Sequence, residues 1–151
     1  MKRVYCNEKY CVNCHLCEIY CLAAHSPAPD LIKAFSPSDG IRPVARIQVE
    51  ESRPRSMAVS CRHCLHPLCA DSCISGALTK DPNTGIVLSD PEKCVACWSC
   101  LSVCSIGAIR KGFVAGRPVS VKCDLCQGRE IPACVEACPN QALTYEDRGE
   151  N

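Results

Sequence analysis

The sequence predicts an α+β fold in which short helices and small antiparallel hairpins surround groups of cysteines. The chain has 151 residues, which suits one compact domain and leaves no room for a large separate catalytic domain. Seventeen residues are cysteine, whereas the aromatic residues are one Trp, four Tyr and two Phe, so ordinary apolar packing is sparse. The cysteines recur in four groups, each followed by the pattern of a short helix and paired strands, which indicates an array of similar units.

The first and third groups share the spacing C-x₂-C-x₂-C-x₃-C. They comprise Cys11, Cys14, Cys17 and Cys21, and Cys94, Cys97, Cys100 and Cys104. In ferredoxins with two clusters, a run of this kind supplies three thiolates to one iron–sulfur cluster, and its fourth thiolate ligates the other. The spacing therefore predicts [4Fe–4S] clusters that share cysteines between groups.

The second and fourth groups are stretched versions of the same run, so that sixteen of the seventeen cysteines form four groups of four. They comprise Cys61, Cys64, Cys69 and Cys73, and Cys123, Cys126, Cys134 and Cys138. Four [4Fe–4S] clusters are the expected cofactors, with these sixteen cysteines as the iron ligands. Cys6 is left over, and we interpret it as a buried free thiol. Zinc favours separated C-x₂-C pairs and does not explain the third and fourth cysteines, although the last group alone could form a zinc ribbon.

The segments between the motifs predict short strands and one short helix. The helix extends over residues 22–24 and ends at Pro27 and Pro29, since proline cannot donate to a helix. Turn residues at 81–85 predict a hairpin, and Gly112 and Gly116 are interpreted as a second turn. The expected strands are residues 1–5, 44–49, 57–60, 76–80, 86–88, 107–110, 118–121 and 141–145.

An insertion without motif cysteines separates the first two groups. It is expected to contain a loop at residues 36–40, and it is rich in arginine. Two interpretations remain open: a solvated face balanced by Glu50 and Glu51, or a docking element for a partner. The arginines in and beside it are Arg42, Arg46, Arg53, Arg55 and Arg62.

Cysteine usage and charge restrict the function classes. An odd cysteine count, ligand-like spacing and the lack of an apolar signal region favour a reducing, cytoplasmic and anaerobic setting over disulfides. No apolar run approaches the roughly 20 residues of a membrane span.

The formal charge of +1 counts thiols as neutral, and four thiolate-bound clusters would change it to roughly −7. Nucleic acid is therefore not an expected partner. No nucleotide-binding or zinc-hydrolase motif is present, and we expect no catalytic residues.

On these motifs the chain resembles the four-cluster ferredoxin-like electron-transfer subunits of molybdenum and tungsten oxidoreductases, hydrogenases and carbon monoxide dehydrogenases. Specific marks besides the four motifs are the gap at residues 65–68, the segment from Lys122 to Cys126, and Ala137 to Pro139. The length is most similar to the ferredoxin subunits of carbon monoxide dehydrogenase or tungsten aldehyde oxidoreductase. The resemblance implies one domain, 1–151, made of two nested bacterial-ferredoxin-like modules. The outer module is 1–24 plus 115–151, the insertion is 25–60, and the inner module is 61–114.

The resemblance also implies how the sixteen cysteines are shared. We name the four sets by number. The first quartet is Cys11, Cys14, Cys17 and Cys138; the second is Cys21, Cys123, Cys126 and Cys134; the third is Cys61, Cys64, Cys69 and Cys104; the fourth is Cys73, Cys94, Cys97 and Cys100. Complete thiolate sets leave no vacancy for His15, His63 or His66, which are expected beside the ligands or on the surface. Trp98 is expected to cover a cluster.

The implied function is the relay of single electrons within a hetero-oligomeric oxidoreductase complex. One partner would be a metal-containing catalytic subunit, such as a tungsten or molybdenum aldehyde oxidoreductase or carbon monoxide dehydrogenase, and the other a flavoprotein or ferredoxin. Two alternatives are a freely diffusing polyferredoxin and a zinc-stabilised interaction module. Metal analysis separates the zinc module from the other two, and co-purification separates a fixed subunit from a mobile carrier.

Overall fold

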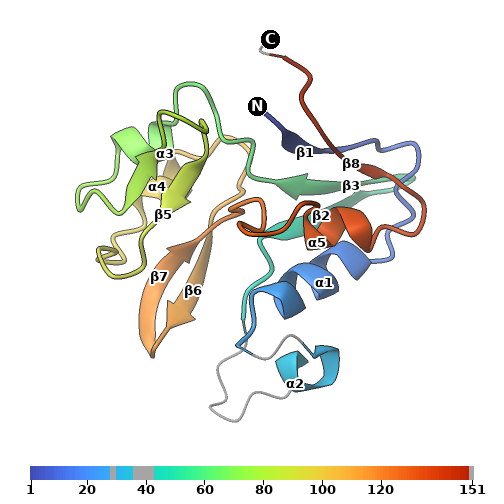
Figure 1. The fold of residues 1–151 in the computed structure, drawn as a ribbon, viewed down its shortest axis with the longest axis horizontal. Helices are drawn as coiled ribbons and strands as arrows, with labels where there is room; N and C mark the ends of the chain where they lie inside the picture. The colour runs from blue at the N-terminus through green and yellow to red at the C-terminus, as the bar shows by residue number, and fades with distance from the viewer. Residues whose placement is uncertain (28–29, 36–42, 150–151) are drawn as a thin grey trace.

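Small antiparallel sheets and short helices make up the chain, which confirms the predicted fold class (Figure 1). The computed structural model describes residues 1–27, 30–35 and 43–149. None of the helices in these ranges is long and apolar enough to cross a membrane. The elements are β1 (Arg3–Cys6), α1 (Leu16–Ala24), α2 (Leu31–Phe35), β2 (Ile47–Ser52), β3 (Arg55–Ser60), α3 (Leu68–Asp71), β4 (Leu78–Lys80), β5 (Val87–Ser89), α4 (Ser99–Ser102), β6 (Arg110–Val114), β7 (Arg117–Val121), α5 (Ala133–Glu136) and β8 (Leu143–Glu146).

The two ends of the chain form one sheet. Strand β1 pairs with β8 in antiparallel register, from Arg3 opposite Glu146 to Cys6 opposite Leu143. Helices α1 and α5 pack against one another, and Figure 1 shows these N-terminal and C-terminal elements on the same side of the molecule. The first and fourth cysteine groups therefore lie side by side although about a hundred residues separate them.

The predicted strand pair in the insertion is present, but its first strand lies further along the chain than expected. Strand β2 covers Ile47–Ser52, where the alternation predicted residues 44–49, and it pairs with β3. Ile47 and Val49 are buried together with Ala58, and β2 packs against α1. The paired strands thus belong to the core beside the first cysteine group. The loop expected at residues 36–40 lies outside the described residues.

Helices α3 and α4 and strands β4 to β7 form the other side of the molecule, whereas α2 packs against α1. Strands β4 and β5 form the predicted hairpin, and α3 packs against α4 and β4 (Figure 1). The predicted turn through Gly112 is wrong, because Gly112 lies inside β6 opposite Val119. A Cβ at Gly112 would be 2.5 Å from a methyl carbon of Val121, so this glycine permits close packing. The chain turns instead at Ala115 and Gly116, both with positive φ, as the tight turns of twisted hairpins require.

Cysteines make up much of the core. The larger core cluster combines Cys17, Cys21, Cys61, Cys123 and Cys134 with aliphatic side chains from both ends of the chain and from the insertion. A second, smaller cluster contains Cys100, Leu78 and Ile109. The composition predicts few apolar side chains for the core. Cysteines fill part of it, and metal binding to cysteines can contribute folding free energy.

Candidate iron–sulfur centres

All four cysteine loops contain a left-handed residue at the same place, two positions after the first cysteine. The residues are Asn13, His63, Ala96 and Leu125, with φ of 55°, 45°, 54° and 60°. Such a residue turns successive backbone N–H groups toward one side and forms a concave site for an anion. For a residue other than glycine this conformation costs roughly 1–2 kcal/mol. The loops are therefore shaped around something negatively charged that repays the strain.

The sulfurs of the first quartet, Cys11, Cys14, Cys17 and Cys138, line one cavity. Val49, Ala58 and Leu143 form its apolar wall. Cys6 lines the same cavity and is half-buried, so it lies beside the quartet. The backbone N–H of Ala58 donates to its sulfur at 3.3 Å. The burial expected for Cys6 is thus only partial.

The second quartet, Cys21, Cys123, Cys126 and Cys134, is wholly buried. Burial raises the pKa of the Cys134 thiol well above its ordinary value, and the neighbouring sulfurs of Cys123, Cys21 and Cys126 raise it further. Burial likewise raises the pKa of Cys123 to about 12. A thiolate here needs a positive charge close by, which iron supplies.

The third and fourth quartets lie on the other side of the molecule. Cys61, Cys64, Cys69 and Cys104 line a cavity of about 230 Å³ with Val87 and Ile109 in its wall. In the fourth quartet, burial raises the pKa of Cys100, and the sulfurs of Cys73 and Cys94 add to the rise. Cys97 completes this set and is exposed, and the sulfur of Cys73 acts on it as well. The first and third predicted sets thus each line one cavity, and sulfurs of the second and of the fourth set lie near enough to act on one another.

Backbone N–H groups are directed at the last cysteine of each motif. In three motifs the donor follows within five residues, where the chain begins its next strand: Leu78 to Cys73 and Ala108 to Cys104, both at 3.4 Å, and Ala142 to Cys138 at 3.2 Å. In the first motif the donor to Cys21 is Arg46, at 3.2 Å, from the insertion. Such bonds favour the thiolate form and influence cluster potentials.

An ionic network surrounds the second quartet. The Asp124 carboxylate accepts from Nε2 of His25 at 3.0 Å and from the Arg46 guanidinium at 2.5 Å. Burial alone would lower the pKa of His25, but its bonds to Asp124 and Cys21 raise it to about 9. Burial would raise the pKa of Asp124, yet His25 and Arg46 hold it far below its usual range. Sequence reasoning missed this role of Arg46, because no local signal links it to Asp124.

The other singled-out residues lie mostly at the surface. His15 is exposed and pairs with Glu18 at 3.0 Å, and His66 is exposed as well, whereas His63 is fully buried. Trp98 is half-buried beneath the ammonium of Lys111, 5.0 Å from the ring centre.

Two exposed insertion arginines have acidic partners, Arg53 with Glu51 and Arg55 with Glu8, which favours the solvated-face interpretation. Arg42 lies outside the described residues.

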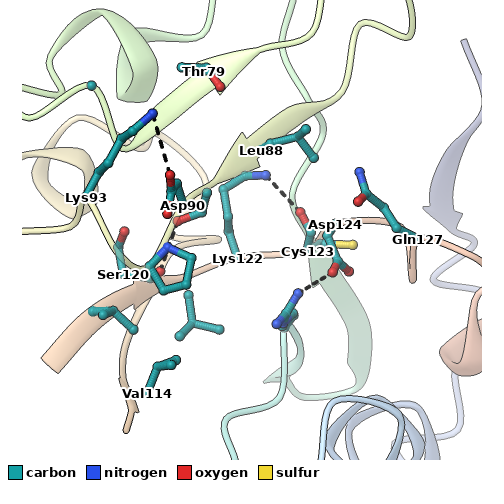
Figure 2. A pocket seen from close by; sticks show the side chains of 16 residues that line it. Thr79, Leu88, Asp90, Lys93, Val114, Ser120, Lys122, Cys123, Asp124 and Gln127 are labelled. Atoms are coloured by element: carbon teal, nitrogen blue, oxygen red, sulfur yellow. Dashed lines mark hydrogen bonds and ion pairs between the residues drawn. The ribbon is translucent and has the colours of Figure 1, made fainter. Parts of the chain in front are cut away.

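A further cavity of about 410 Å³ opens between β5, β7 and the fourth cysteine loop (Figure 2). Its wall is polar and carries charges of both signs, including Asp90, Lys93, Lys122 and Asp124. Cys123 is the one cysteine among its lining residues, so this cavity is not a site enclosed by a quartet.

The donor set of the four sites fits [4Fe–4S] clusters. Each set offers four cysteine sulfurs, within loops or beside strands that direct N–H groups toward them. Cysteine thiolates are the ligands that hold [4Fe–4S] clusters in proteins, and each quartet consists of cysteines alone. His25 and Asp124 also place possible ligand atoms within 4.8 Å of the Cys126 sulfur, but both side chains are engaged in the ionic network with Arg46.

Comparisons with known proteins agree with this chemistry. Residues 55–148 match the family described as the 4Fe-4S dicluster domain. An iron–sulfur protein of Rhodospirillum rubrum is 35% identical, over 95% of this chain and 81% of its own. The electron transport protein HydN of Escherichia coli is 34% identical, over 91% of this chain and 83% of its own. The putative oxidoreductase AegA of Escherichia coli is 36% identical over 91% of this chain, which spans only 20% of AegA. The chain therefore belongs to the 4Fe-4S dicluster domain family, and it is an electron-transfer iron–sulfur protein that holds [4Fe–4S] clusters.

Proposed function

We propose that the chain relays single electrons through four [4Fe–4S] clusters between a catalytic oxidoreductase subunit and a second redox protein. The four quartets named above are the proposed ligand sets, and the bound clusters supply the one-electron chemistry. The arrangement that supports the proposal is a row of the four quartets, which we infer from the effects of their sulfurs on one another and from a shared core cluster.

The order in the row follows from which sulfurs lie close enough to act on one another. Cys17 of the first quartet contributes to the raised pKa of Cys134 in the second, after burial and the sulfurs of its own quartet. Cys61 of the third quartet contributes to that of Cys123 in the second, after burial and Cys21. Cys100 of the fourth quartet shares a core cluster with Cys69 and Cys104 of the third. The first and fourth quartets are therefore the ends.

Both ends of the row are accessible. Cys14 in the first quartet and Cys97 in the fourth are exposed, while all four cysteines of the second quartet are buried. Cys64 gives the third quartet one exposed cysteine as well. Partners can thus approach the two end sites closely, as short-range electron exchange requires, and the second-quartet site inside the row is protected from solvent.

The row of four sites corresponds to two modules that each hold two sites. We assign residues 1–24 plus 115–151 to the outer module, which is supported by the β1–β8 pairing and the packing of α1 on α5. Residues 61–114 form the inner module, supported by the packing of α3 on α4. Residues 25–60 are the insertion, whose paired strands and Arg46 complete the outer module. The β6–β7 hairpin crosses the boundary between the modules.

The proposed partners are a metal-containing catalytic subunit and a flavoprotein or ferredoxin, in a hetero-oligomeric complex. A tungsten or molybdenum aldehyde oxidoreductase or carbon monoxide dehydrogenase is the class of catalytic subunit we propose. The occurrence of a similar region as one fifth of a putative oxidoreductase supports an association with a larger enzyme. The cytoplasm of an anaerobic cell is the setting that suits sixteen cysteines kept reduced for iron.

Metal analysis tests the cofactor content. Protein purified without oxygen should contain about sixteen irons and about sixteen acid-labile sulfides per chain. Twelve of each would remove one quartet from the assignment, and stoichiometric zinc would contradict the electron-transfer role. In addition, Cys138→Ala should alter the spectroscopic signal of the first quartet more than that of the second. The opposite result would overturn the sharing of ligands between motifs.

Electron transfer between the partners tests the row itself. Replacing Cys97, at one end, by Ser should abolish transfer between the partners while the catalytic subunit stays active with an artificial dye. Cys6→Ser is the matched control, because Cys6 lies beside the first quartet without belonging to it. If inter-partner transfer survived loss of the fourth-quartet cluster, that site would be a side branch. A subunit that never co-purified with an enzyme would instead be a mobile carrier.

A further inference from the structure

The backbone of one residue in β5, Val87, connects two cysteine loops from different modules. Its N–H donates to Nδ1 of His63 at 3.0 Å, and its carbonyl accepts a hydrogen bond from the Lys122 ammonium. His63 lies between Cys61 and Cys64 of the third quartet. Lys122 directly precedes Cys123 of the second quartet, and its ammonium also donates to the Cys123 carbonyl at 2.8 Å (Figure 2). These hydrogen bonds therefore link the loop of the third quartet to the loop of the second quartet. We call this region the crossing between the two modules.

His63 presents an unused hydrogen-bond donor at this crossing. Because its Nδ1 accepts from Val87, the ring proton is on Nε2. The side chain is 0% exposed, and Nε2 has no hydrogen-bond partner among the residues that the structure describes. A buried N–H without an acceptor costs roughly 1–3 kcal/mol. Burial together with the positive charges of Lys122 and Arg3 holds the pKa of His63 down to about 3, and Asp124 opposes this, so the ring lies among charges of the outer module.

Lys122 places a positive charge in the same interior. The side chain is 3% exposed, and both of its acceptors are neutral carbonyls. Burial raises the pKa values of Cys61 and Cys69, and the Lys122 charge acts against this rise at both. The ammonium thus lies near enough to the third quartet to stabilise negative charge there. Neither residue is a cluster ligand, and their burial excludes direct contact with a partner.

We propose that Lys122 and His63 set the reduction potentials at the crossing between the two modules. Lys122 acts on the third-quartet site through its charge, and the buried Nε2–H of His63, which no described protein group accepts, would act on the group bound at the second-quartet site. The inference rests on the proposed ligand sets. Each site accepts one electron from its neighbour and passes one on, and no bond or proton changes hands at either residue.

These residues can affect the potentials because reduction adds a negative charge to a site that is already negatively charged. A buried positive charge nearby lowers the energy of the reduced state, and solvent screens it little at this depth. Hydrogen bonds to cluster sulfurs and the net charge around a cluster are among the factors that set its potential. Removing these residues should therefore make the sites at the crossing harder to reduce.

The decisive experiment is a redox titration of the reconstituted full chain, followed by electron paramagnetic resonance. Lys122→Gln removes the charge but keeps an N–H donor for the two carbonyls. We expect the reduction equilibrium of the third-quartet site to fall about tenfold, which is a shift of about 59 mV to lower potential for one electron. The fourth-quartet site should not change. His63→Asn, which places here the residue found at the equivalent position in the first loop, should lower the potential of the second-quartet site by a smaller amount.

Lys80→Gln is the matched control. Lys80 also donates to a carbonyl of the third-quartet loop, that of Leu65 at 2.8 Å, but it is on the surface, so the same charge change should shift no potential measurably. Iron content equal to the wild type shows that the ligand sets are intact. The steps are assigned with Cys64→Ser and Cys126→Ser, which replace an exposed ligand of the third quartet and a second-quartet ligand that lies outside the larger core cluster.

The outcomes distinguish failure of the role of Lys122 and His63 from failure of the proposed ligand sets. Unchanged potentials in both Lys122→Gln and His63→Asn, with full iron content and separate steps for Cys64→Ser and Cys126→Ser, would overturn the role of Lys122 and His63 alone. An equal shift in Lys80→Gln would overturn the role of burial. If Cys64→Ser and Cys126→Ser altered the same step, the ligand sets and the role of Lys122 and His63 would fail together. If Lys122→Gln does not fold, the His63→Asn titration decides.

Discussion

The second and fourth quartets each consist of four cysteines, but the surroundings of these cysteines differ. Every cysteine of the second quartet is buried, and burial raises the pKa values of Cys123, Cys126 and Cys134. In the fourth quartet Cys97 is exposed, and hydrogen bonds from the backbone and hydroxyl of Ser99 lower its pKa. Burial works against ionisation at Cys73, but bonds from Leu78 and Ser75 bring its pKa below the ordinary value.

This difference indicates two roles for identical ligands. Thiols must lose their protons to bind iron, so the buried second quartet depends most on the cluster charge for its stability. The site is also where both ends of the chain and the insertion meet, through α1, α5 and Arg46. The fourth quartet is held by a small hairpin and two single-turn helices, and its Cys97 is exposed although Cys100 is buried. The second site joins the parts of the fold, and the fourth is the more accessible of the two.

The largest effect should follow from removing all iron. Oxygen and a chelator should unfold the chain, because the buried thiols and the left-handed loops lose the charge that stabilises them. Circular dichroism measures the loss of secondary structure. Iron should leave the exposed fourth quartet before the buried second one, which a time course of EPR signals can follow. A native spectrum and a cooperative melt after complete iron loss would contradict the cluster-dependent core.

Single ligand replacements should separate the two sites next. Cys97→Ser should lose the fourth-quartet cluster alone and keep about twelve irons and a folded chain, because Cys97 is exposed and lies outside the larger core cluster. Cys134→Ser should lose more than one cluster and much of the helical signal, since Cys134 lies in the larger core cluster. Iron assay and circular dichroism of the two variants measure the contrast. Equal losses in both would show that burial does not distinguish the quartets.

A smaller effect is expected when the ionic network beside the second quartet is broken. Asp124→Asn leaves His25 and Arg46 without their carboxylate, which should cost about 2 kcal/mol, or a fall of roughly 5 °C in melting temperature at a fixed scan rate. Arg53→Ala is the control, because its pair with Glu51 is exposed and should contribute little.

The effect of Asp124→Asn should depend on pH. The pKa of His25 is raised to about 9, so its contribution is complete below its ordinary value near 6.5 and is lost as the pH rises through 9. Asp124 has a lowered pKa, so its contribution is present above its ordinary value and is lost in acid. The difference in melting temperature between wild type and variant should therefore be greatest at about pH 4–6.5 and shrink above pH 9. A difference that grew above pH 9 would contradict this assignment.

The smallest effect should come from Cys6→Ser. The Cys6 sulfur accepts one backbone hydrogen bond, from Ala58, and serine can accept the same bond. We expect full iron content and a melting temperature within a few degrees of the wild type. Iron assay and EPR of the first-quartet signal provide the check. Loss of about four irons would show that Cys6 is a ligand.

Local patterns predicted the strands well where a turn was strongly marked. The hairpin of β4 and β5 follows the turn residues at 81–85, as expected. Gly112 was misinterpreted because glycine serves both turns and close packing, and only the side chain of Val121 above it distinguishes the two. Strand β2 was displaced from its predicted range because Ile47 and Val49, which face the core beside α1, decide its position.

The sequence by itself determined the cofactor chemistry and the fold class, because a cluster-binding loop is a local structure whose ligand spacing is written into consecutive residues. It could not indicate that His63 and Lys122 meet at Val87, or that Arg46 reaches both Cys21 and Asp124. Those contacts join residues 24 to 78 positions apart, and they depend on which loops the paired chain ends bring together. Tertiary structure alone therefore decided which sites are buried and which charges surround them.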